Sequence, residues 1–496
     1  MDWIRLGVLL LGLMVIIGFS EFVRKKSKWS VNVTRKLVHI TAGVLIALTP
    51  FLLENSNPLF VIAGFFIVLN FFAIKKGWMP GMHATDRVSY GTVFYPLSFL
   101  ILVLLLWDDY KSILVIAMLI MAVADAVAAI VGENLKNPLT FQYSGEKKSL
   151  QGSLVMLLAA FIIALFGLKF ISPIDNISIS WLNIFWYSSI VALIAAASEA
   201  VSFKGLDNIS VPLASAFILH YYVAHSPEQN ASLTFGVLLA LAIAVVSFHL
   251  RFLSVTGALA TFLLGSVVFG IGKWEFSLPL LLFFVLSSLL SKVGKKKKKQ
   301  FADTFQKGGQ RDLGQVFANG GIAGIFVLFW NFFPQQIFYM AFVGSIAAVT
   351  ADTWGTEIGV FSKIKPRNII NFKKVPPGTS GGVTAVGFLG GLLGSLIIVL
   401  LSKQVTNYYD GLLLGLPALI IIAGLFGSVI DSIVGATIQA QFKCPNCGKI
   451  TEKKLHCENH QTNIDSGFKM IDNDVVNAIC ALSGAVFAAL AYLVVI

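Results

Sequence analysis

Five acidic side chains lie within long apolar segments or at their ends, where a charge is costly. They are Asp125, Glu199, Asp352, Glu357 and Asp431. An aspartate at the centre of a bilayer costs about 2.5–3.5 kcal/mol on insertion scales, so each of these acids needs a partner or a function. Such carboxylates could bind Mg²⁺, a proton or another cation. One acid alone could instead sit at a helix end and pair with a neighbouring lysine.

A basic loop follows the first of these acids. Lys147, Lys148 and Ser149 come directly before an apolar segment that begins near residue 150. Two cations, a hydroxyl and the free N–H groups at a helix start favour a bound phosphate. Mg²⁺ typically joins one or two carboxylates to substrate phosphates. Acids and basic loop together predict a site that handles phosphoryl groups, although the two lysines alone would be interpreted as interfacial anchors.

A glycine-rich loop follows Asp352. Thr379 and Ser380 lie in the segment Pro377–Gly382, which can expose backbone N–H groups to an anion, with Lys373 and Lys374 just before it. The loop also fits the G-x-S-x-G pattern of hydrolases. That elbow needs a preceding strand and an α/β fold, which this sequence does not offer, so we reject a hydrolase. No Walker-type loop or soluble nucleotide-binding motif is present.

Acids and loops recur in the same order in the two halves of the chain. Asp125 with Gly132 is matched by Asp352 with Gly359, Lys148–Ser153 by Gly378–Gly382, Glu199 by Asp431, and Asp207 with Asn208 by Asp472 with Asn473. One such match could arise by chance, but four in order indicate an internal repeat. We predict two related membrane domains, over residues 1–230 and 231–496.

Composition fixes the class of protein that must position these residues. The chain has 496 residues, of which 56% are hydrophobic and 12% charged, and its mean hydropathy is +0.81. Soluble domains carry about 25% charged residues, so a soluble enzyme is excluded. With about 20 apolar residues needed for each span, the apolar segments predict an all-α polytopic membrane protein. We expect about 14–17 transmembrane helices in two bundles.

The net charge of +12 is interpreted as basic cytoplasmic loops and contact with the lipid bilayer, with no nucleic acid as partner. Lysines and arginines gather in the connectors 24–28, 295–299 and 363–374. The positive-inside rule places such loops in the cytoplasm. We therefore expect a multi-pass protein whose active sites face the cytoplasm.

A short segment near the C-terminus offers metal ligands. Cys444, Cys447, Cys457 and His460, with His456 nearby, supply enough thiolate and imidazole for a tetrahedral zinc site. One C-x-x-C pair is a weak signal, and a reduced surface hairpin is the alternative. We assign the segment 441–470 to a cytoplasmic insertion with a structural role.

Glycines follow the second loop at helical spacing. Gly387, Gly390, Gly391 and Gly394 include pairs four residues apart, an interval that is typical of closely packed membrane helices. We predict that they form a helix contact and take no part in chemistry.

The first half resembles the phytol kinase and dolichol kinase family of membrane prenol kinases. The resemblance rests on Arg35–His39, Arg87–Pro96, Ala124–Gly132, Glu146–Ser153 and Glu199–Pro212. Members of this family transfer phosphate from CTP, or a related nucleoside triphosphate, to an isoprenoid alcohol. The resemblance therefore implies a phosphotransferase that uses Mg²⁺ and an alcohol such as phytol or geranylgeraniol.

The second half is similar to the phytyl-phosphate kinase family. The matching stretches are Thr256–Gly265, Arg311–Gly321, Ala351–Gly359, Gly378–Val383 and Asp431–Gly435. This resemblance implies that the second half adds another phosphate, so that one bifunctional chain converts a prenol to its monophosphate and then to its diphosphate in prenol salvage.

The resemblances assign roles to particular residues. In the first half, Asp125, Glu199 and Asp207 are expected to act as Mg²⁺ ligands or base, with Lys147, Lys148, Ser149 and Asn208 on the nucleotide and His39 or Arg87 near the transferred group. In the second half, Asp352, Glu357, Asp431 and Asp472 take the acidic roles, with Mg²⁺ on Asp352 and Asp431, and Arg311, Gln315, Asn319, Thr379, Ser380 and Asn473 bind phosphate. His39 enters only through the resemblance.

Three other functions remain open at this point. A CTP-dependent lipid-phosphate cytidylyltransferase would use similar acids and basic loops but would release pyrophosphate. A secondary transporter would explain a repeated helical bundle with acids near the middle of the membrane. A scaffold or lipid-binding protein would tolerate the loss of these acids.

Overall fold

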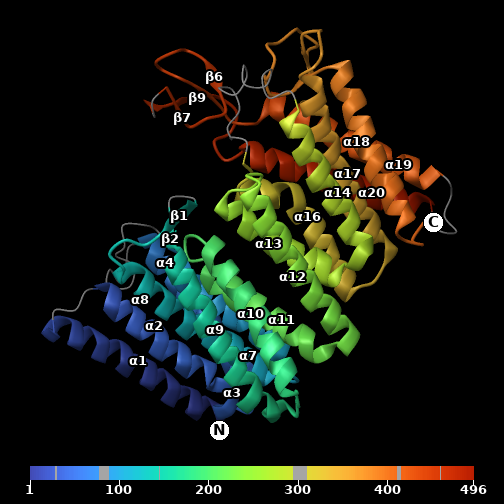
Figure 1. The fold of residues 1–496 in the computed structure, drawn as a ribbon. Coiled ribbons are helices and arrows are strands. Elements are labelled where there is room, and N and C mark those ends of the chain that lie inside the picture. Colours follow the sequence, from blue (N-terminus) through green and yellow to red (C-terminus); the bar gives the residue numbers. More distant parts are fainter. Residues whose placement is uncertain are drawn as a thin grey trace. The chain divides into compact units, whose positions relative to one another are not determined.

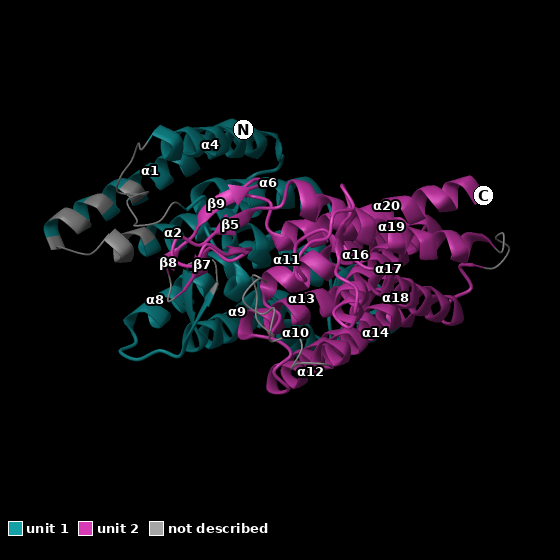
Figure 2. Cartoon of the chain, turned by 90° about the horizontal axis from the view of Figure 1, so that it is seen from above, with its two compact units in different colours: residues 1–234 teal, residues 235–496 magenta. Residues whose placement is uncertain are grey.

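The computed structural model describes residues 1–27, 31–76, 89–143, 146–293, 310–409, 415–457 and 460–495. The chain forms two compact units, Met1–Thr234 and Phe235–Ile496, which are drawn in teal and magenta in Figure 2. Each unit is a bundle of helices (Figure 1).

Unit 1 is built from helices and one short hairpin. Its elements are α1 (Asp2–Ser27), α2 (Val31–Ala47), α3 (Thr49–Leu52), α4 (Asn57–Lys76), α6 (Gly91–Leu106), α7 (Lys111–Leu119), the π-helix η1 (Ile120–Asp125), α8 (Ala126–Asn134), β1 (Thr140–Tyr143), β2 (Glu146–Ser149), α9 (Leu150–Phe170), the 3₁₀ turn η2 (Ser172–Asp175), α10 (Trp181–Val201) and α11 (Asp207–Ala224). Helix α12 (Pro227–His249) contains the boundary between the units.

The helix that carries Asp125 lies at the centre of unit 1. Segments α7, η1 and α8 follow one another without a break and form a single apolar span, Lys111–Asn134. Side chains from Ile113 to Met118 have no exposed surface, because α2, α6, α9 and α11 all contact this span. The π-helix ends at Asp125. Such wide turns are rare in proteins as a whole but are often found at functional sites. The hydropathy pattern did not predict this one.

Unit 2 contains helices and a small β module. Its elements are α13 (Val255–Ile271), α14 (Lys273–Lys292), α16 (Leu313–Phe332), α17 (Gln336–Gly359), β3 (Arg367–Asn368), β4 (Gly382–Val383), α18 (Ala385–Gln404), α19 (Gly415–Thr437), β5 (Gln441–Lys443), β6 (Ile450–Thr451), β7 (Leu455–His456), β8 (His460–Gln461), β9 (Asn463–Ser466) and α20 (Asn473–Val495).

Helix α17, which carries Asp352, has the central place in unit 2. Its residues from Tyr339 to Ala351 are buried, and α14, α16, α18, α19 and α20 pack around it. Glycines of α18 allow a close contact with α17. A Cβ atom on Gly391 would lie 2.9 Å from the carbonyl oxygen of Ala351, and one on Gly394 would lie 3.1 Å from the carbonyl oxygen of Thr350. The predicted helix contact is confirmed.

The membrane class is also confirmed. Among the described residues, 12 helices are long and apolar enough to cross a membrane, and three shorter apolar helices accompany them. Large apolar side chains such as Phe65, Leu105 and Leu182 are well exposed on the bundles, as expected of surfaces that face lipid. The protein is an all-α polytopic membrane protein, and the number of 14–17 spans stays a prediction.

Between α19 and α20 the chain folds into short strands that the sequence did not predict. Strand β5 pairs with β6 and β9 in a three-stranded sheet, and β7 and β8 form a hairpin. Figure 1 shows these strands at one end of the helices of unit 2. We call residues 441–466 the β module.

Replacing Gly344 by valine is expected to destabilise unit 2. A Cβ atom at Gly344 in α17 would lie 2.4 Å from the Cβ of Ala488 and 2.5 Å from the carbonyl oxygen of Gly484. Overpacking of this kind costs about 1–3 kcal/mol. Gly64→Val is the matched control, because a Cβ there would meet no described atom within 4 Å. Size-exclusion chromatography after heating in detergent measures both, and equal losses would contradict the close contact.

Candidate functional site

The hairpin of unit 1 separates the two predicted lysines. Strands β1 and β2 pair antiparallel, with Phe141 opposite Lys148. Successive side chains of a strand point to opposite faces, so Lys147 is exposed while Lys148 turns inward and is partly buried. The structure thus brings Lys148 to the acids and leaves Lys147 in solvent.

Lys148 is the cation of an acidic cluster. Its Nζ forms an ion pair with Glu199, near the end of α10, and lies 3.8 Å from Oδ2 of Asp207, in the first turn of α11. Burial alone would lower the pKa of Lys148, but Glu199, Asp207 and Asp125 outweigh that effect and raise it. Lys148 therefore stays protonated, and three predicted acids converge on it.

Sequence reasoning missed a second cation near this cluster. Lys36 of α2 places a positive charge near the carboxyl group of Asp125. Its Nζ lies 2.5 Å from Oε2 of Glu133. The sequence offered a signal for it, because Lys36 is part of the Arg35–His39 stretch that carries the family resemblance.

Ser149 marks the start of α9 and lies against α8. Its Oγ accepts a hydrogen bond from the Gly152 N–H at 3.1 Å, as an N-cap does. A Cβ atom on Gly132 would lie 2.7 Å from this Oγ and 3.5 Å from the Cα of Gly152. The two glycines thus let α8 and α9 meet at the helix entrance beside Lys148.

Asp207 and Asn208 are held by a tight turn. Asn208 donates from Nδ2 to Oδ1 of Asp207 at 2.9 Å. Gly205 precedes them with φ +86°, and a Cβ there would lie 2.3 Å from the Gly91 nitrogen. Only glycine accommodates both the left-handed backbone and the close approach. Arg87, predicted to act nearby, lies outside the described residues.

His39 of α2 faces the π-helix. Its Nε2 lies 3.4 Å from the carbonyl oxygen of Met121, and its ring packs edge-on against Tyr95 with centroids 5.5 Å apart. His39 thus lies next to the segment that ends at Asp125.

In unit 2, Asp352 and Asp431 lie side by side. Their carboxyl groups lie close enough to influence each other, and Ser428 lies near Asp352. Oδ2 of Asp431 is buried and makes no hydrogen bond within the described part of the chain. In the described residues no lysine or arginine forms an ion pair with either acid. Two buried carboxylates in this position need a shared proton or a cation between them.

The glycine-rich loop lies directly on α19, the helix of Asp431. A Cβ on Gly381, whose φ is +74°, would lie 2.6 Å from the carbonyl oxygen of Ser432. Ser380 donates from Oγ to Oε1 of Glu452 at 2.8 Å. Thr379 Oγ1 instead bonds the Pro376 carbonyl within the loop. The structure brings Ser380 toward the acids, together with Glu452, which the sequence analysis did not identify.

The structure changes the register of the internal repeat. Thr384 caps α18 by accepting from the Gly387 N–H, just as Ser149 caps α9. A Cβ on Gly359 would lie 3.4 Å from Thr384 Oγ1 and 3.5 Å from the Cα of Gly387, which matches the surroundings of Gly132. The counterpart of Ser149 is therefore Thr384 and not Ser380.

The residues directly before the two capping residues differ in charge. Lys148 directly precedes Ser149, the last residue of β2, and Val383, the last residue of β4, directly precedes Thr384. Unit 2 therefore has an apolar side chain at the position of the lysine that neutralises the acids of unit 1. The acid pair of unit 2 must be neutralised in another way.

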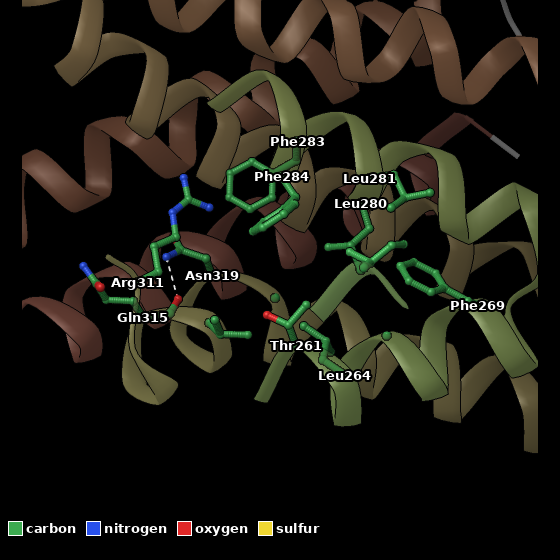
Figure 3. A pocket seen from close by; sticks show the side chains of 14 residues that line it. Thr261, Leu264, Phe269, Leu280, Leu281, Phe283, Phe284, Arg311, Gln315 and Asn319 are labelled. Atoms are coloured by element: carbon green, nitrogen blue, oxygen red, sulfur yellow. Dashed lines mark hydrogen bonds between the residues drawn. The ribbon is translucent and has the colours of Figure 1, made fainter. Parts of the chain in front are cut away.

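Arg311 lies at the end of an apolar pocket in unit 2 (Figure 3). The pocket is lined by Thr261, Leu264, Phe269, Leu280, Leu281, Phe283 and Phe284, among others. The guanidinium carbon is 5.5 Å from the ring centre of Phe283 and 5.8 Å from that of Phe284. Burial lowers the pKa of Arg311 to about 10, against the opposing effect of Glu357, so the group is still charged at neutral pH.

Gln315 and Asn319 line the same pocket, but helix α16 uses their polar groups. Gln315 forms a capping box with Asp312, and Asn319 donates from Nδ2 to the Gln315 carbonyl at 2.7 Å, the dashed line of Figure 3. These two residues position α16, and Arg311 is the charged group of the pocket.

Asp472 caps a helix in the structure. Its Oδ1 accepts from the Val475 N–H at 3.2 Å, at the start of α20, where Asn473 is the first helical residue. Asp472 thus differs from Asp207, its counterpart in the repeat, which lies near a lysine.

The β module gathers metal-ligating side chains. One ligand atom each of Cys444, Cys447, His456 and Cys457 lie within 4.8 Å of one another. His460 is directed elsewhere, with Nδ1 2.6 Å from the carbonyl oxygen of Cys457. Backbone N–H groups of Cys447 and Asn446 lower the pKa of the Cys444 thiol to about 6, against its burial. The histidine of this cluster is His456, whereas the predicted ligand His460 lies outside it.

The arrangement in unit 1 suits chemistry on a bound phosphate. One protonated lysine, three carboxylates and a helix N-terminus meet where several spans end. Such a set can neutralise phosphate charge, hold a divalent ion and accept a proton.

One protein family and several known proteins are similar to parts of this chain. The family model described as Integral membrane protein DUF92 matches residues 238–485. Protein PGR of Arabidopsis thaliana is 35% identical over 277 residues, which cover 50% of this chain and 92% of that protein. A phytol kinase of Synechocystis is 32% identical over 220 residues, covering 44% and 90%. The chloroplastic protein VTE6 of Arabidopsis thaliana is 27% identical over 244 residues, covering 48% and 65%. No solved structure matches the chain.

Removing the Lys148 cation is expected to destabilise unit 1. Loss of one partner from a fully buried ion pair costs about 3–5 kcal/mol, and Lys148→Met should cost less because 21% of this side chain is exposed. Lys147→Met, on the exposed face of the same strand, is the matched control. Lys148→Met combined with Glu199→Gln should recover part of the loss. Thermal unfolding in detergent measures each variant, and strictly additive effects would contradict the pair.

Proposed function

The chain belongs to the integral membrane DUF92 family and to a phytol kinase-like family, and from this premise we propose that it is a membrane kinase that phosphorylates an isoprenoid alcohol. The observation that carries the proposal is the position of Lys148 among Glu199, Asp207 and Asp125, beside the N-terminus of α9. A relative named phytol kinase, whose length the chain covers almost completely, supports the alcohol as acceptor.

In this proposal, unit 1 binds a nucleoside triphosphate at the hairpin. Lys148 and the N–H groups at the start of α9 face its phosphates, and Ser149 fixes that helix start. Asp125 and Glu199 would hold Mg²⁺, which when bound neutralises phosphate charge. We favour CTP as the nucleotide because the resembling kinases use it.

The transfer step follows from these positions. The alcohol oxygen attacks the terminal phosphorus, the bond from that phosphorus to the bridging oxygen breaks, and the nucleoside diphosphate leaves. Asp207 accepts the alcohol proton. Its carboxylate is suited to this because Lys148 and Asn208 hold it in place. The products are a prenyl monophosphate, the nucleoside diphosphate and one proton.

The membrane setting suits an apolar acceptor. Asp125 lies nine residues before the end of its span at Asn134, or about 13 Å along the helix. A prenyl tail gains about 0.8 kcal/mol for each CH₂ that stays out of water. The tail can therefore remain in lipid while its hydroxyl reaches the acids. The basic connectors argue that the sites face the cytoplasm.

We assign a second transfer to unit 2, which would make the chain a bifunctional enzyme of prenol salvage. Asp352 and Asp431 would hold Mg²⁺, since in the described residues no lysine or arginine pairs with them. Arg311 would bind the phosphate of the prenyl monophosphate, and the apolar pocket beside it would take the start of the chain (Figure 3). The product would be a prenyl diphosphate.

The two sites can be tested by single substitutions. Asp125→Asn is expected to lower monophosphate formation on the order of 100-fold and to leave conversion of supplied monophosphate intact. Asp352→Asn should let monophosphate accumulate. Purified protein given geranylgeraniol, CTP and Mg²⁺, with lipid products followed by mass spectrometry, separates the steps.

Several results would count against the assignment. Equal loss of both steps in either folded variant would exclude two independent sites. Transfer of the cytidylyl group with release of pyrophosphate would indicate a cytidylyltransferase. Movement of prenol without nucleotide consumption would indicate a transporter.

The pocket of unit 2 gives a separate test. Arg311→Gln should raise KM for prenyl monophosphate about tenfold to 100-fold, as expected for a hydrogen bond to a charged group. Lys403→Gln, an exposed cation at the end of α18, is the control. Thr261→Phe should fill the pocket and impair long prenyl monophosphates more than short ones. An unchanged KM in both pocket variants would place the substrate elsewhere.

A further inference from the structure

The β module brings four ligand atoms together from two separate turns. Cys444 and Cys447 follow β5, while His456 and Cys457 come at the end of β7. His456 Nδ1 lies 3.5 Å from Cys447 Sγ and 3.2 Å from Cys457 Sγ, and all four ligand atoms lie within 4.8 Å of one another. All three thiols are free.

These distances suit one tetrahedral metal ion. Zinc binds thiolate sulfur at about 2.3 Å and imidazole nitrogen at about 2.0–2.1 Å, so its ligand atoms are about 3.4–3.8 Å apart. The cluster is close to this size already. Three thiolates with one imidazole are typical of structural zinc sites, whereas iron–sulfur clusters usually take four thiolates.

The backbone around the ligands is shaped for this purpose. Cys444 accepts at its carbonyl from the Gly448 N–H at 2.9 Å and donates from its own N–H to Lys449 at 3.0 Å, and Gly448 has φ +69°. This closed turn directs the Cys444 and Cys447 thiols to one side.

The left-handed conformation of Cys457 explains how two neighbouring residues bind together. Consecutive side chains of a strand point to opposite faces. Cys457 has φ +43°, a region that residues other than glycine rarely adopt, and this turn brings its thiol to the side of the His456 ring. A strained backbone at a site with convergent ligands is expected where an added bond stabilises it.

The β module has too little core to be stable by itself. Within its described residues, Phe442, Cys444 and Thr451 alone are buried, and β6, β7 and β8 have two residues each. Small domains of this kind usually need a metal or a disulfide. A structural zinc ion can supply the missing free energy of folding.

The module contacts the candidate site of unit 2 through Glu452. Glu452, directly after β6, accepts through Oε1 from Ser380 Oγ at 2.8 Å and from Gln439 Nε2 at 3.0 Å. Its carboxylate also places a negative charge near the carboxyl group of Asp431. The shape of the module thus determines where the Ser380 hydroxyl points.

We propose that Cys444, Cys447, His456 and Cys457 bind one structural zinc ion, which holds the β module so that Glu452 positions Ser380 beside Asp431. The metal site stands independently of the kinase assignment. The role of Glu452 as a positioning residue rests on the proposed second transfer.

Metal analysis tests the site without any assay of turnover. The full chain, purified in detergent and dialysed against a weak chelator, should hold about one zinc ion per chain by elemental mass spectrometry. Cys447→Ser and His456→Ala should lose the metal, and His460→Ala should keep it. A chain that binds no zinc even after zinc is added would overturn the proposal, as would loss in His460→Ala with retention in His456→Ala.

A second measurement covers variants that fail to fold. Wild-type protein loaded with Co²⁺ should show the visible absorption of a tetrahedral thiolate site, and a thiol-modifying reagent should release zinc in step with cysteine modification. An octahedral cobalt spectrum, or full modification without zinc release, would exclude the assigned ligands.

Substitution of Glu452 tests the link to the second transfer. Glu452→Gln should keep the zinc and the first phosphorylation, and it should lower kcat for prenyl monophosphate about tenfold with little change in KM. Glu452→Asp should recover part of that loss. Asp465→Asn, an exposed acid in β9 of the same module, is the matched control. An unchanged second step in Glu452→Gln would refute the positioning role, while the absence of any second step in wild-type protein would refute the kinase assignment and leave the zinc result standing.

Discussion

The neutralisation of carboxylates on a central, water-poor helix is the constraint on which the rest of this structure depends. Asp125 follows a stretch, Ile113–Met118, without exposed surface, and Asp352 follows the buried stretch of α17. Charges there are stable only with a partner, because the surroundings solvate them poorly. Unit 1 supplies Lys148 from a hairpin that bends back over the end of the bundle. The glycine contacts, the capped start of α9 and the tight turn at Gly205 all serve to place that lysine and its acids.

The two units differ in the charged residues that surround their buried acids. Both place an acid on the central helix, then an antiparallel hairpin, then a helix capped by a hydroxyl three residues before a glycine. Lys148 precedes the cap in unit 1, whereas Val383 precedes it in unit 2. Unit 2 therefore lacks a lysine beside Asp352 and Asp431, and Glu452 adds further negative charge near Asp431.

The sequence predicted those features that depend on residue type and on spacing along the chain. It missed those that depend on local backbone geometry. Apolar segments gave the membrane class, and the repeated acids gave the helices on which the sites lie. The π-helix before Asp125 leaves no mark in hydropathy. The equivalence of Ser149 with Ser380 failed because unit 2 has a longer connection before its cap, so that Thr384 takes the place. Likewise, Gln315 has a phosphate-binding side chain by type, but the capping box occupies it. His460 fits a metal site by spacing, but in the structure His456 joins the three thiols and the Nδ1 of His460 lies at the Cys457 carbonyl oxygen.

The depth of the acids also bears on how an alcohol can compete with water as acceptor. Only 10% of the Glu199 side chain and 21% of that of Lys148 are exposed, so few water molecules reach the phosphate that these residues would hold. Water is a competing nucleophile in phosphoryl transfer, and its exclusion both prevents hydrolysis and strengthens each charge interaction in the site. A soluble kinase needs a moving lid to achieve this. In the proposed site, the spans that bury Asp125 would keep water away, and the lipid phase would bring the hydroxyl to the acids at the end of its own apolar chain.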